Sequence, residues 1–332
     1  MPETRDKTIG VFLLNLGGPD SLGAVRPFLF NLFSDREIIR LGPSFMQKPL
    51  AYLISSLRHK KTEGFYRQIG GRSPILEITT AQASALEESL NGSAQAVSPA
   101  RFRVFIGMRY WRPFIGDVVP AIAQEGIRRV IALGLYPQYS VATTGSSLSR
   151  LQAAAAGLPL ELHSVLSWYD HPLYLDALTE RIREGLGRFT DNHSGVHLLF
   201  SAHSLPKKFI DEGDPYADHI KATVAEVVRR IDVPWSLCYQ SRSGPVEWLE
   251  PSTERMIGEL AAKGVRNLLV VPVSFVSDHI ETLYEIDILY KSMARGLGMR
   301  LERVESLNTF PLFIAALGDI VKRGIKEAGW VE

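Results

Sequence analysis

Short apolar runs alternate along the chain with longer segments whose apolar residues recur at helical spacing. The runs predict strands at residues 9–15, 103–106, 129–135, 160–164, 196–201, 235–239, 267–273 and 301–304. Helical periodicity predicts helices at residues 74–90, 114–126, 172–187, 216–231, 253–263 and 311–328. Apolar strands that alternate with helices are typical of parallel sheets covered on both faces. The pattern therefore predicts an α/β fold.

The second half of the chain repeats the first in outline. Gly126 and Gly264 each open a similar stretch, with a basic residue, an apolar strand and then a polar segment in the same order. We therefore expect two similar Rossmann-like domains, residues 1–168 and 169–310, and a C-terminal helix within 311–332 that packs back. Doubly wound sheets bind ligands at the carboxyl ends of their strands, so the active-site cleft is expected between the two domains.

The strand at 267–273 leads into an abruptly polar segment. Ser277 or Asp278 suits a helix N-cap, and Glu281 follows Asp278 at the spacing of a capping box. Glu281 and Glu285 then lie one turn apart on the predicted helix. Its apolar stripe is predicted to consist of Ile280, Leu283, Tyr284 and Ile288. The two carboxylates form either a solvated acidic face or part of a site at a strand end.

His203 follows the apolar run at 196–201, so it should emerge at the carboxyl end of a strand. Histidine is the usual general base near neutral pH and a common metal ligand, although a lone histidine is more often structural. If the sheet is doubly wound, His203 and Glu281 can meet at one site. A histidine and a carboxylate suit divalent iron, cobalt or zinc, and two protein ligands make a weak, open metal site.

Residues 41–61 interrupt the α/β pattern. Leu50, Leu53, Ile54 and Leu57 form a helical stripe that is followed directly by basic residues. One interpretation is a helix packed on the core. The other is an apolar lip with a basic rim, suited to an amphipathic ligand or a membrane surface.

Composition narrows the class of protein. The 332 residues carry a formal net charge of +1, so bulk electrostatic binding to nucleic acid is not expected. The single cysteine, Cys238, excludes an intrachain disulfide and a cysteine-rich metal site, and it fits a reducing cytoplasm. We find neither a signal-peptide pattern nor a membrane-spanning run. Arg109, at a predicted strand end, requires an anionic partner if it is buried.

The assembled motifs resemble ferrochelatases, over residues 10–328. They are Leu13-Leu-Asn-Leu-Gly-Gly-Pro-Asp20, Tyr66-Arg-Gln-Ile-Gly-Gly-Arg-Ser-Pro74, Gly107-Met-Arg-Tyr110, Tyr136-Pro-Gln-Tyr-Ser140, Phe200-Ser-Ala-His-Ser-Leu-Pro206, Gln240-Ser-Arg-Ser-Gly-Pro245 and Phe275-Val-Ser-Asp-His-Ile-Glu-Thr-Leu-Tyr284. The resemblance implies the chelatase fold and a lyase that inserts ferrous iron into a porphyrin, the terminal step of heme biosynthesis. Protoporphyrin IX is the expected substrate.

The resemblance also implies roles for individual residues. It makes His203 and Glu281 the catalytic and iron-contacting pair, and Glu285 part of a proton or metal path. The residues implied in porphyrin binding are Leu16, Arg58, Tyr66, Ser73, Arg109, Tyr110, Tyr136, Ser140, Ser241, Trp248, Phe275, Asp278 and His279. The lip, at residues 41–57, matches the family's apolar mouth segment and suggests peripheral contact with the inner face of the cell membrane.

Two positions depart from patterns within the family. Val141 stands where animal members have the first of four cluster cysteines, and the chain stops before the others, so neither an iron–sulfur cluster nor another tightly bound cofactor is expected. Leu289 stands where some members continue the acidic helix line beyond Glu285, so any outer metal site should be weaker.

Three alternatives remain open at this stage. The chain could act on coproporphyrin III, or it could insert cobalt or use another tetrapyrrole. A third alternative is a two-domain protein that binds tetrapyrrole or metal without chemistry. The placement of His203 counts against that last alternative.

Overall fold

The computed structural model describes residues 8–92, 101–189 and 195–330. The chain divides into two compact units, Met1–Trp168 with Asn308–Glu332, and Tyr169–Leu307. Each unit contains one four-stranded parallel sheet, which confirms the predicted α/β class. Each unit also has its own hydrophobic core.

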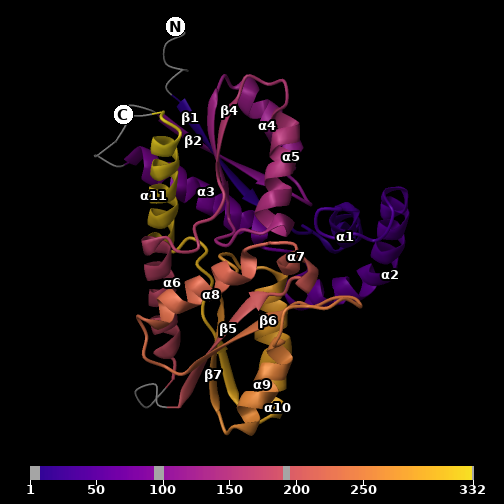
Figure 1. The fold of residues 1–332 in the computed structure, drawn as a ribbon, viewed down its shortest axis with the longest axis vertical. Coiled ribbons are helices and arrows are strands. Elements are labelled where there is room, and N and C mark those ends of the chain that lie inside the picture. The colour runs from indigo at the N-terminus through magenta and orange to yellow at the C-terminus, as the bar shows by residue number, and fades with distance from the viewer. Residues whose placement is uncertain (1–7, 93–100, 190–194, 331–332) are drawn as a thin grey trace. The chain divides into compact units, whose positions relative to one another are not determined.

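The sheet of the first unit has the order β2-β1-β3-β4. Its strands are β1 (Thr8–Asn15), β2 (Arg101–Met108), β3 (Arg129–Gly134) and β4 (Glu161–Val165). Helices α4 (Ile115–Gln124) and α5 (Ser146–Ala155) cover one face (Figure 1), where Phe12 and Leu14 are fully buried. α5 follows a short π-helix, η3 (Val141–Gly145). Near-complete burial of β1 explains why its sequence is a continuous apolar run.

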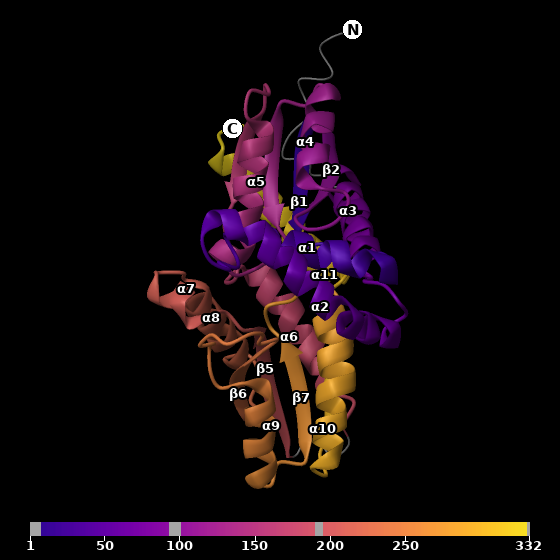
Figure 2. The same cartoon turned by 90° about the vertical axis from the view of Figure 1, so that its right-hand side faces the viewer.

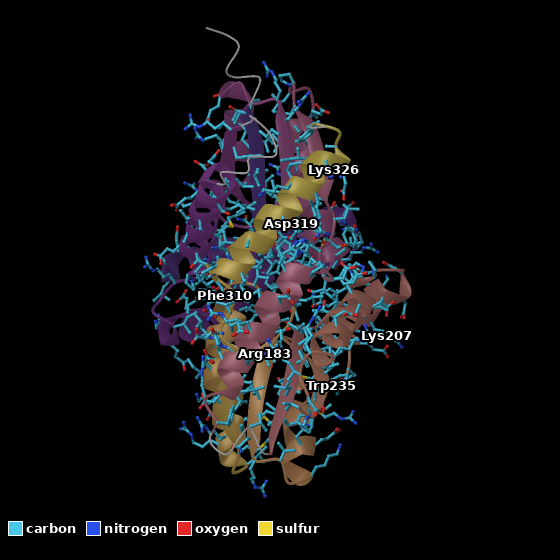
Figure 3. The ribbon with its side chains drawn as sticks, turned by 90° about the vertical axis from the view of Figure 1, so that its left-hand side faces the viewer. Arg183, Lys207, Trp235, Phe310, Asp319 and Lys326 are labelled. Atoms are coloured by element: carbon cyan, nitrogen blue, oxygen red, sulfur yellow. The ribbon has the colours of Figure 1, made fainter. Side chains whose placement is uncertain are left out.

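Helices α3 (Ile75–Gly92) and α11 (Pro311–Glu327) lie on the other face of this sheet. Figure 3 shows the length of α11 between the labelled Phe310 and Lys326. At Gly324 an added Cβ would lie 3.4 Å from His163 and 3.5 Å from Val165, so the helix packs closely on β4. The last helix of the chain therefore belongs to the first unit.

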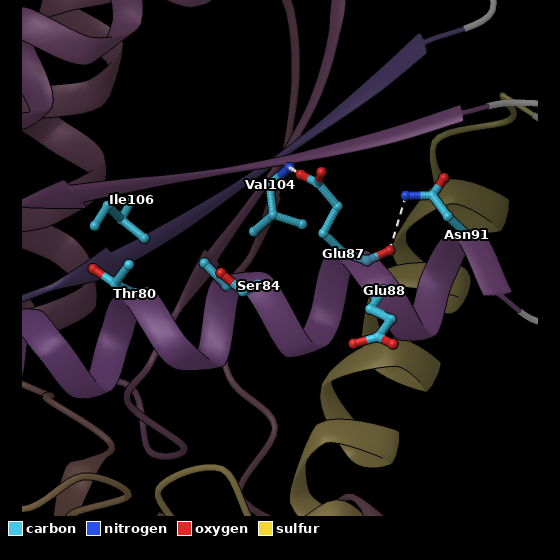
Figure 4. Close-up of a pocket in the computed structure, with 8 residues that line it drawn as sticks. Thr80, Ser84, Glu87, Glu88, Asn91, Val104 and Ile106 are labelled. Atoms are coloured by element: carbon cyan, nitrogen blue, oxygen red, sulfur yellow. Dashed lines mark hydrogen bonds between the residues drawn. The ribbon is translucent and has the colours of Figure 1, made fainter.

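α3 also closes the open edge of the sheet at β2. Glu87 accepts a hydrogen bond from the Val104 backbone N–H at 2.7 Å, and Asn91 bonds both backbone groups of Phe102. Figure 4 shows Glu87, Asn91 and Val104 along this seam, beside a hollow of about 410 Å³. Side chains that occupy the backbone groups of an edge strand protect it from pairing with another chain.

Helix α1 (Val25–Ser34), after a 3-10 turn η1 (Leu22–Ala24), packs on α2 (Gln47–Gln68), which follows a second turn η2 (Ser44–Met46). The contact side of α2 carries the buried Ala51 and Ser55. The exposed large apolar side chains of this segment are Phe45, Met46, Tyr52, Leu53 and Leu57. Of the predicted stripe, Leu53 and Leu57 are therefore exposed, which favours the lip over the core interpretation.

The sheet of the second unit has the equivalent order, β6-β5-β7-β8. Its strands are β5 (Val196–His203), β6 (Trp235–Gln240), β7 (Asn267–Pro272) and β8 (Arg300–Arg303). The shared order confirms that the two halves are similar. In each sheet the chain winds first to one side of the starting strand and then to the other, which creates a switch point, here between β5 and β7, where α/β folds place their sites.

The helices α9 (Thr253–Ala262) and α10 (Lys291–Gly296) flank this sheet (Figure 2), together with the π-helix η4 (Glu281–Tyr290). The remaining helices of the unit are α6 (Pro172–Leu186), α7 (Lys207–Asp211) and α8 (Tyr216–Val228). Gly185 of α6 approaches Leu269 of β7 so closely that a Cβ would lie 3.1 Å from it. The predicted helices are thus present, with ends shifted by a few residues.

The predicted details of the helix after β7 are wrong. Its first residues are not capped by Ser277 or Asp278, because Ile280 occupies the N-cap position and makes no side-chain capping bond. The predicted apolar stripe is only partly buried. The buried residues are Thr282, Ile286 and Tyr290. The segment is a π-helix, with i→i+5 bonding, instead of the α-helix assumed from the sequence.

Candidate active site

His203 is the last residue of β5, and both of its backbone groups are held by side chains. Its N–H donates to Ser274 Oγ at 2.9 Å, and the Tyr216 hydroxyl donates to its carbonyl at 2.9 Å. The pairing of β5 with β7 ends at Ser201 and Pro272, so His203 lies beyond it and these side-chain contacts take the place of backbone bonds to β7. The imidazole is therefore presented from a fixed backbone at the switch point of the sheet.

The imidazole of His203 is paired with Glu281, the first residue of η4. Nδ1 lies 2.7 Å from Glu281 Oε2, a distance typical of a charge-assisted hydrogen bond. The Glu281 side chain is 17% exposed and that of His203 is 36% exposed. The residue pair predicted to meet thus does so, with the second ring nitrogen, Nε2, left for another contact.

Ser241 and Gln240, at the end of β6, join Glu281 to Glu285. The Ser241 hydroxyl lies 2.8 Å from Glu281 Oε2 and 2.5 Å from Glu285 Oε2. Gln240 Nε2 donates to the Glu281 carbonyl and to Glu285 Oε2, both at 3.1 Å. Ser241 has φ 67°, a strained backbone for a residue with a side chain. The two glutamates therefore form one hydrogen-bonded unit rather than a solvated acidic face.

Burial and mutual charge separate the pKa values of these groups. Burial opposes the charged form of His203, but the Glu281 carboxylate, with Glu285 behind it, outweighs burial and raises the His203 pKa. Burial would raise the pKa of Glu281, but the His203 charge and hydrogen bond lower it strongly. Burial and the Glu281 charge raise the pKa of Glu285 to about 7. One carboxylate thus stays ionised while the other exchanges protons near neutral pH.

Phe275 and His279 lie beside the pair. The Phe275 ring meets the His203 ring edge-on at 6.3 Å and the His279 ring at 4.5 Å. His279 is 8% exposed, and burial lowers its pKa despite the nearby Glu281. A neutral second imidazole and an aromatic ring therefore border the pair.

Asp278 holds the loop in place. Its Oδ1 accepts from Thr282, from Ser306 and from Arg303. Arg303 is also bonded through two nitrogens to Asp287. This network fixes both sides of the segment that carries Glu281 and Glu285.

Trp248 is paired with the segment that follows β5. It forms an antiparallel bridge with Pro206, three residues beyond His203. Its indole Nε1 is buried and has no hydrogen-bond partner among the described residues. An unsatisfied indole N–H in this position is a candidate donor to a bound ligand.

A second polar cluster in the first unit contains Arg109 and Tyr110, which follow β2. Arg109 Nη2 and the Tyr110 hydroxyl both donate to Asp35 Oδ2 at 2.6 Å, and Ser146 donates to the same oxygen at 2.7 Å. Asp35 is thus the anionic partner that a buried Arg109 requires. Tyr110 is 1% exposed, and burial together with the Asp35 charge raises its pKa strongly.

The other predicted residues of the first unit lie at several places in it. Leu16 follows β1, where its N–H bonds to the Asn15 side chain. Tyr136 follows β3, and its hydroxyl is buried without a hydrogen-bond partner among the described residues. Ser140 is buried, and its Oγ accepts from the Ala142 N–H to cap η3.

Three further predicted residues lie on or after α2. Arg58 is exposed, with its guanidinium over the Phe33 ring at 5.5 Å. Tyr66 is 3% exposed, and Ser73 is 7% exposed and packs against Gly18, where a Cβ would lie 2.5 Å from its Oγ. Their roles toward a porphyrin stay predictions.

Sequence reasoning missed Gln240, Ser274, Tyr216, Asp35 and Ser146 as contributors to these clusters. Gln240 could have been predicted in the same way as His203, since it is also a polar residue at the carboxyl end of a buried strand. Asp35 carried a weaker signal, an acidic residue at a helix C-terminus, where the dipole is unfavourable. Nothing local distinguished Tyr216 or Ser274, whose partner is brought near only by the fold.

The residues able to contact a metal ion at the pair are His203 and Glu281. Within residues 8–92, 101–189 and 195–330, no group of three or more His, Cys, Asp or Glu side chains is arranged to hold a metal ion. Two ligands form a weak and open site, which suits a metal that is passed on rather than retained.

Comparison with known proteins identifies the family of the chain. The ferrochelatase family model matches residues 8–325. The chain is 56% identical over 329 residues to a ferrochelatase of Geotalea uraniireducens, covering 98% of this chain and 99% of that protein. It is 48% identical to a ferrochelatase of Synechocystis, covering 96% of this chain and 83% of that protein.

Solved structures share the fold at low sequence identity. SirB from Bacillus subtilis with Fe3+ has a TM-score of 0.57 at 11% identity, covering 98% of this chain and 99% of that chain. CbiX, described as the terminal enzyme for biosynthesis of siroheme in denitrifying bacteria, has a TM-score of 0.51 at 11% identity, covering 95% of this chain and 98% of that chain. These likenesses confirm a chelatase fold and carry no conclusion about the substrate.

Proposed function

The chain belongs to the ferrochelatase family, and from that premise we propose that it inserts ferrous iron into a porphyrin to form heme. The observation that carries the proposal is the His203–Glu281 pair, 2.7 Å apart at the switch point of the second sheet. The family match supplies the reaction, and this pair supplies groups able to contact iron and accept protons.

Iron enters as a substrate, and two pyrrole N–H protons must leave as it does so. His203 Nδ1 is held by Glu281, so Nε2 is the nitrogen that accepts a pyrrole proton or contacts the metal. Glu281, whose pKa is low, keeps its negative charge near the incoming cation. The pair thus combines a base with a fixed counter-charge.

A proton that His203 passes to Glu281 stays there only briefly, because the Glu281 pKa is low, and it has a short route onward. Ser241 lies within hydrogen-bond distance of both Glu281 and Glu285, so its hydroxyl links the two carboxylates. Glu285, with a pKa raised to about 7, takes up and releases protons at neutral pH. The proposed path therefore runs from His203 through Glu281 and Ser241 to Glu285.

The porphyrin contacts carried over from the family remain part of the proposal. Trp248 and Tyr136 offer buried donors without partners among the described residues, which supports ligand contact at both. Tyr66, Ser73 and Arg58 are proposed to meet the propionates, whereas the Ser241 hydroxyl, which lies between Glu281 and Glu285, is assigned to the proton path instead. Insertion also requires the flat macrocycle to be bent, at a cost of roughly 1–5 kcal/mol supplied by binding over the rest of the ring.

The central experiment compares His203→Ala with His197→Ala. His197 lies on the same strand, and its ring bonds to Ser236. His203→Ala should abolish iron insertion, measured by anaerobic absorbance, while porphyrin binding measured by fluorescence persists. His197→Ala should retain turnover, whereas Glu281→Gln should lose most of it. Near-normal turnover in His203→Ala would remove the catalytic assignment.

The proposed substrate is protoporphyrin IX. The same assay run with coproporphyrin III compares two propionates with four, and competition between ferrous iron and cobalt tests the metal. Faster turnover of coproporphyrin III, or a preference for cobalt, would overturn this part of the proposal. A stoichiometric porphyrin complex without metal insertion would instead favour a binding protein.

We further propose that the lip touches a membrane surface. Phe45 is 77% exposed and Leu57 is 73% exposed. The basic residues Lys48, Arg58 and Lys60 are also exposed, and all three lie on α2. None of the described helices is long and apolar enough to cross a bilayer. Peripheral contact with anionic lipid is therefore the form of association that the surface supports.

Vesicle flotation tests the lip. The wild-type chain should float with vesicles containing phosphatidylglycerol, and Leu53→Ser/Leu57→Ser should not. Leu289→Ser removes an apolar side chain that is 44% exposed elsewhere and should float like the wild type. A wild-type chain that stays unbound would leave the lip as a substrate contact only.

The chain is also proposed to hold no iron–sulfur cluster. Its single cysteine, Cys238, is fully buried, and burial raises the thiol pKa to about 12. A cluster ligand must be a thiolate, so Cys238 is unsuited to the role. Broad cluster absorbance in the anaerobically purified chain would contradict this.

A further inference from the structure

The carboxylate of Asp35 is a shared acceptor in the first unit. Asp35 is 8% exposed, at the C-cap of α1. Its Oδ2 accepts from Arg109 Nη2 at 2.6 Å, from the Tyr110 hydroxyl at 2.6 Å and from Ser146 Oγ at 2.7 Å. Its Oδ1 accepts from the Glu37 backbone N–H at 2.9 Å. One buried carboxylate thus receives four hydrogen bonds.

Local structure does not favour an acidic residue at this position. The C-terminus of a helix carries partial negative charge, which destabilises a carboxylate there. Burial adds a larger cost unless the charge is paired and hydrogen-bonded. Three of the four donors come from the segments that follow β2 and η3, so Asp35 is satisfied mainly by tertiary contacts.

Asp35 and Ser146 together fix the orientation of Arg109. Ser146 accepts from Arg109 Nε at 2.7 Å, while Asp35 accepts from Nη2. The guanidinium also lies over the Tyr110 ring at 5.0 Å. Arg109 lines a cavity of about 390 Å³ together with Asn31, Ser34 and Glu37. Nε and Nη2 make these two bonds, and Nη1, which has no hydrogen-bond partner among the described residues, is able to meet a ligand.

We propose that Asp35 is a positioning residue that holds Arg109 for contact with the porphyrin, with the buried Tyr110 as part of the support. Because Asp35 neutralises the guanidinium, Arg109 offers a directed hydrogen bond and a flat surface rather than net positive charge. This inference rests on the proposed function, and it assigns Asp35 a part in porphyrin binding that acts through Arg109.

A double-mutant cycle on porphyrin affinity tests the proposal. Asp35→Asn should weaken porphyrin binding, followed by fluorescence titration, by about tenfold, within the range of coupled contacts. In an Arg109→Ala background the same substitution should have no further effect. The KM for porphyrin should rise, with the KM for ferrous iron unchanged. Glu125→Gln changes an exposed carboxylate of the same unit that is paired with Arg103, and it should leave both constants as in the wild type.

Ser146→Ala keeps the test decisive if Asp35→Asn fails to fold. It removes one donor to Asp35 and the acceptor of Arg109 Nε, so it should weaken porphyrin binding in the same direction and also lose its effect in Arg109→Ala. Additive effects in both cycles would overturn the proposal while leaving iron insertion by the wild-type chain intact. A wild-type chain that neither binds porphyrin nor inserts iron would overturn the proposed function as well.

Discussion

Replacement of Glu285 by glutamine should make the protein more stable at neutral pH. Burial and the charge of Glu281 raise the Glu285 pKa from 4.5 to about 7. The folded protein therefore binds a proton that the unfolded chain has already released between these pH values. Folding stability associated with Glu285 is complete below pH 4.5 and is lost as the pH rises through 7.

The size of the effect follows from the pKa difference. The folded-state pKa is about 7, so the two units between pH 5 and pH 7, at about 1.4 kcal/mol per unit, correspond to roughly 3 kcal/mol. This is an upper limit, because Ser241 and Gln240 still donate to the carboxylate and Glu281 relaxes with it. The difference in unfolding free energy between Glu285→Gln and the wild type should therefore grow by up to that amount from pH 5 to pH 8.

Urea unfolding followed by tryptophan fluorescence at several pH values measures this difference. Glu88→Gln is the control, since Glu88 is an exposed glutamate on α3, and its difference from the wild type should stay flat. Nuclear magnetic resonance titration of His203 should show a lower pKa in Glu285→Gln, because Glu285 contributes to raising it. A stability difference that is flat, or that shrinks as the pH rises, would refute the reasoning.

Three further outcomes follow from single contacts. Tyr216→Phe removes the donor to the His203 carbonyl, so it should cost about 1–3 kcal/mol in thermal unfolding and slow iron insertion; an unchanged rate would show that the contact does not position the imidazole. Arg303→Met leaves Asp278 and Asp287 unpaired and should cost roughly 3–5 kcal/mol, whereas Arg300→Met, on the surface, should cost less than about 0.5 kcal/mol. Cys238 should react with a thiol reagent at pH 8 only as fast as the protein unfolds, and rapid reaction of the native chain would contradict its burial.

The strands and most helices were predictable because each is encoded by a local repeat. β1 and β5 are buried on both faces, and a strand buried in this way has a continuous apolar sequence. The meeting of His203 and Glu281 was also predictable, because parallel strands bring their carboxyl ends to one edge of a sheet.

The helix after β7 shows where local reasoning fails. Its residues fit an α-helix as well as a π-helix, and the choice between them depends on what packs on either side. Ile286 and Tyr290 are buried against α9 and β8, while Gln240 and Ser241 hold the two glutamates. Those contacts come from distant segments, so the capping box suggested by Asp278 and Glu281 did not form.

The sequence by itself determined the α/β class, the repeat of the two halves and the meeting of His203 with Glu281, because periodicity and strand-end position are local properties of the chain. Tertiary structure decided which side chains form an ion pair and which are joined by a hydrogen bond. Asp35 joins Arg109 across more than seventy positions, and Ser241 joins Glu281 to Glu285. Hydrogen bonds act over about 3 Å, a separation that only the folded chain fixes.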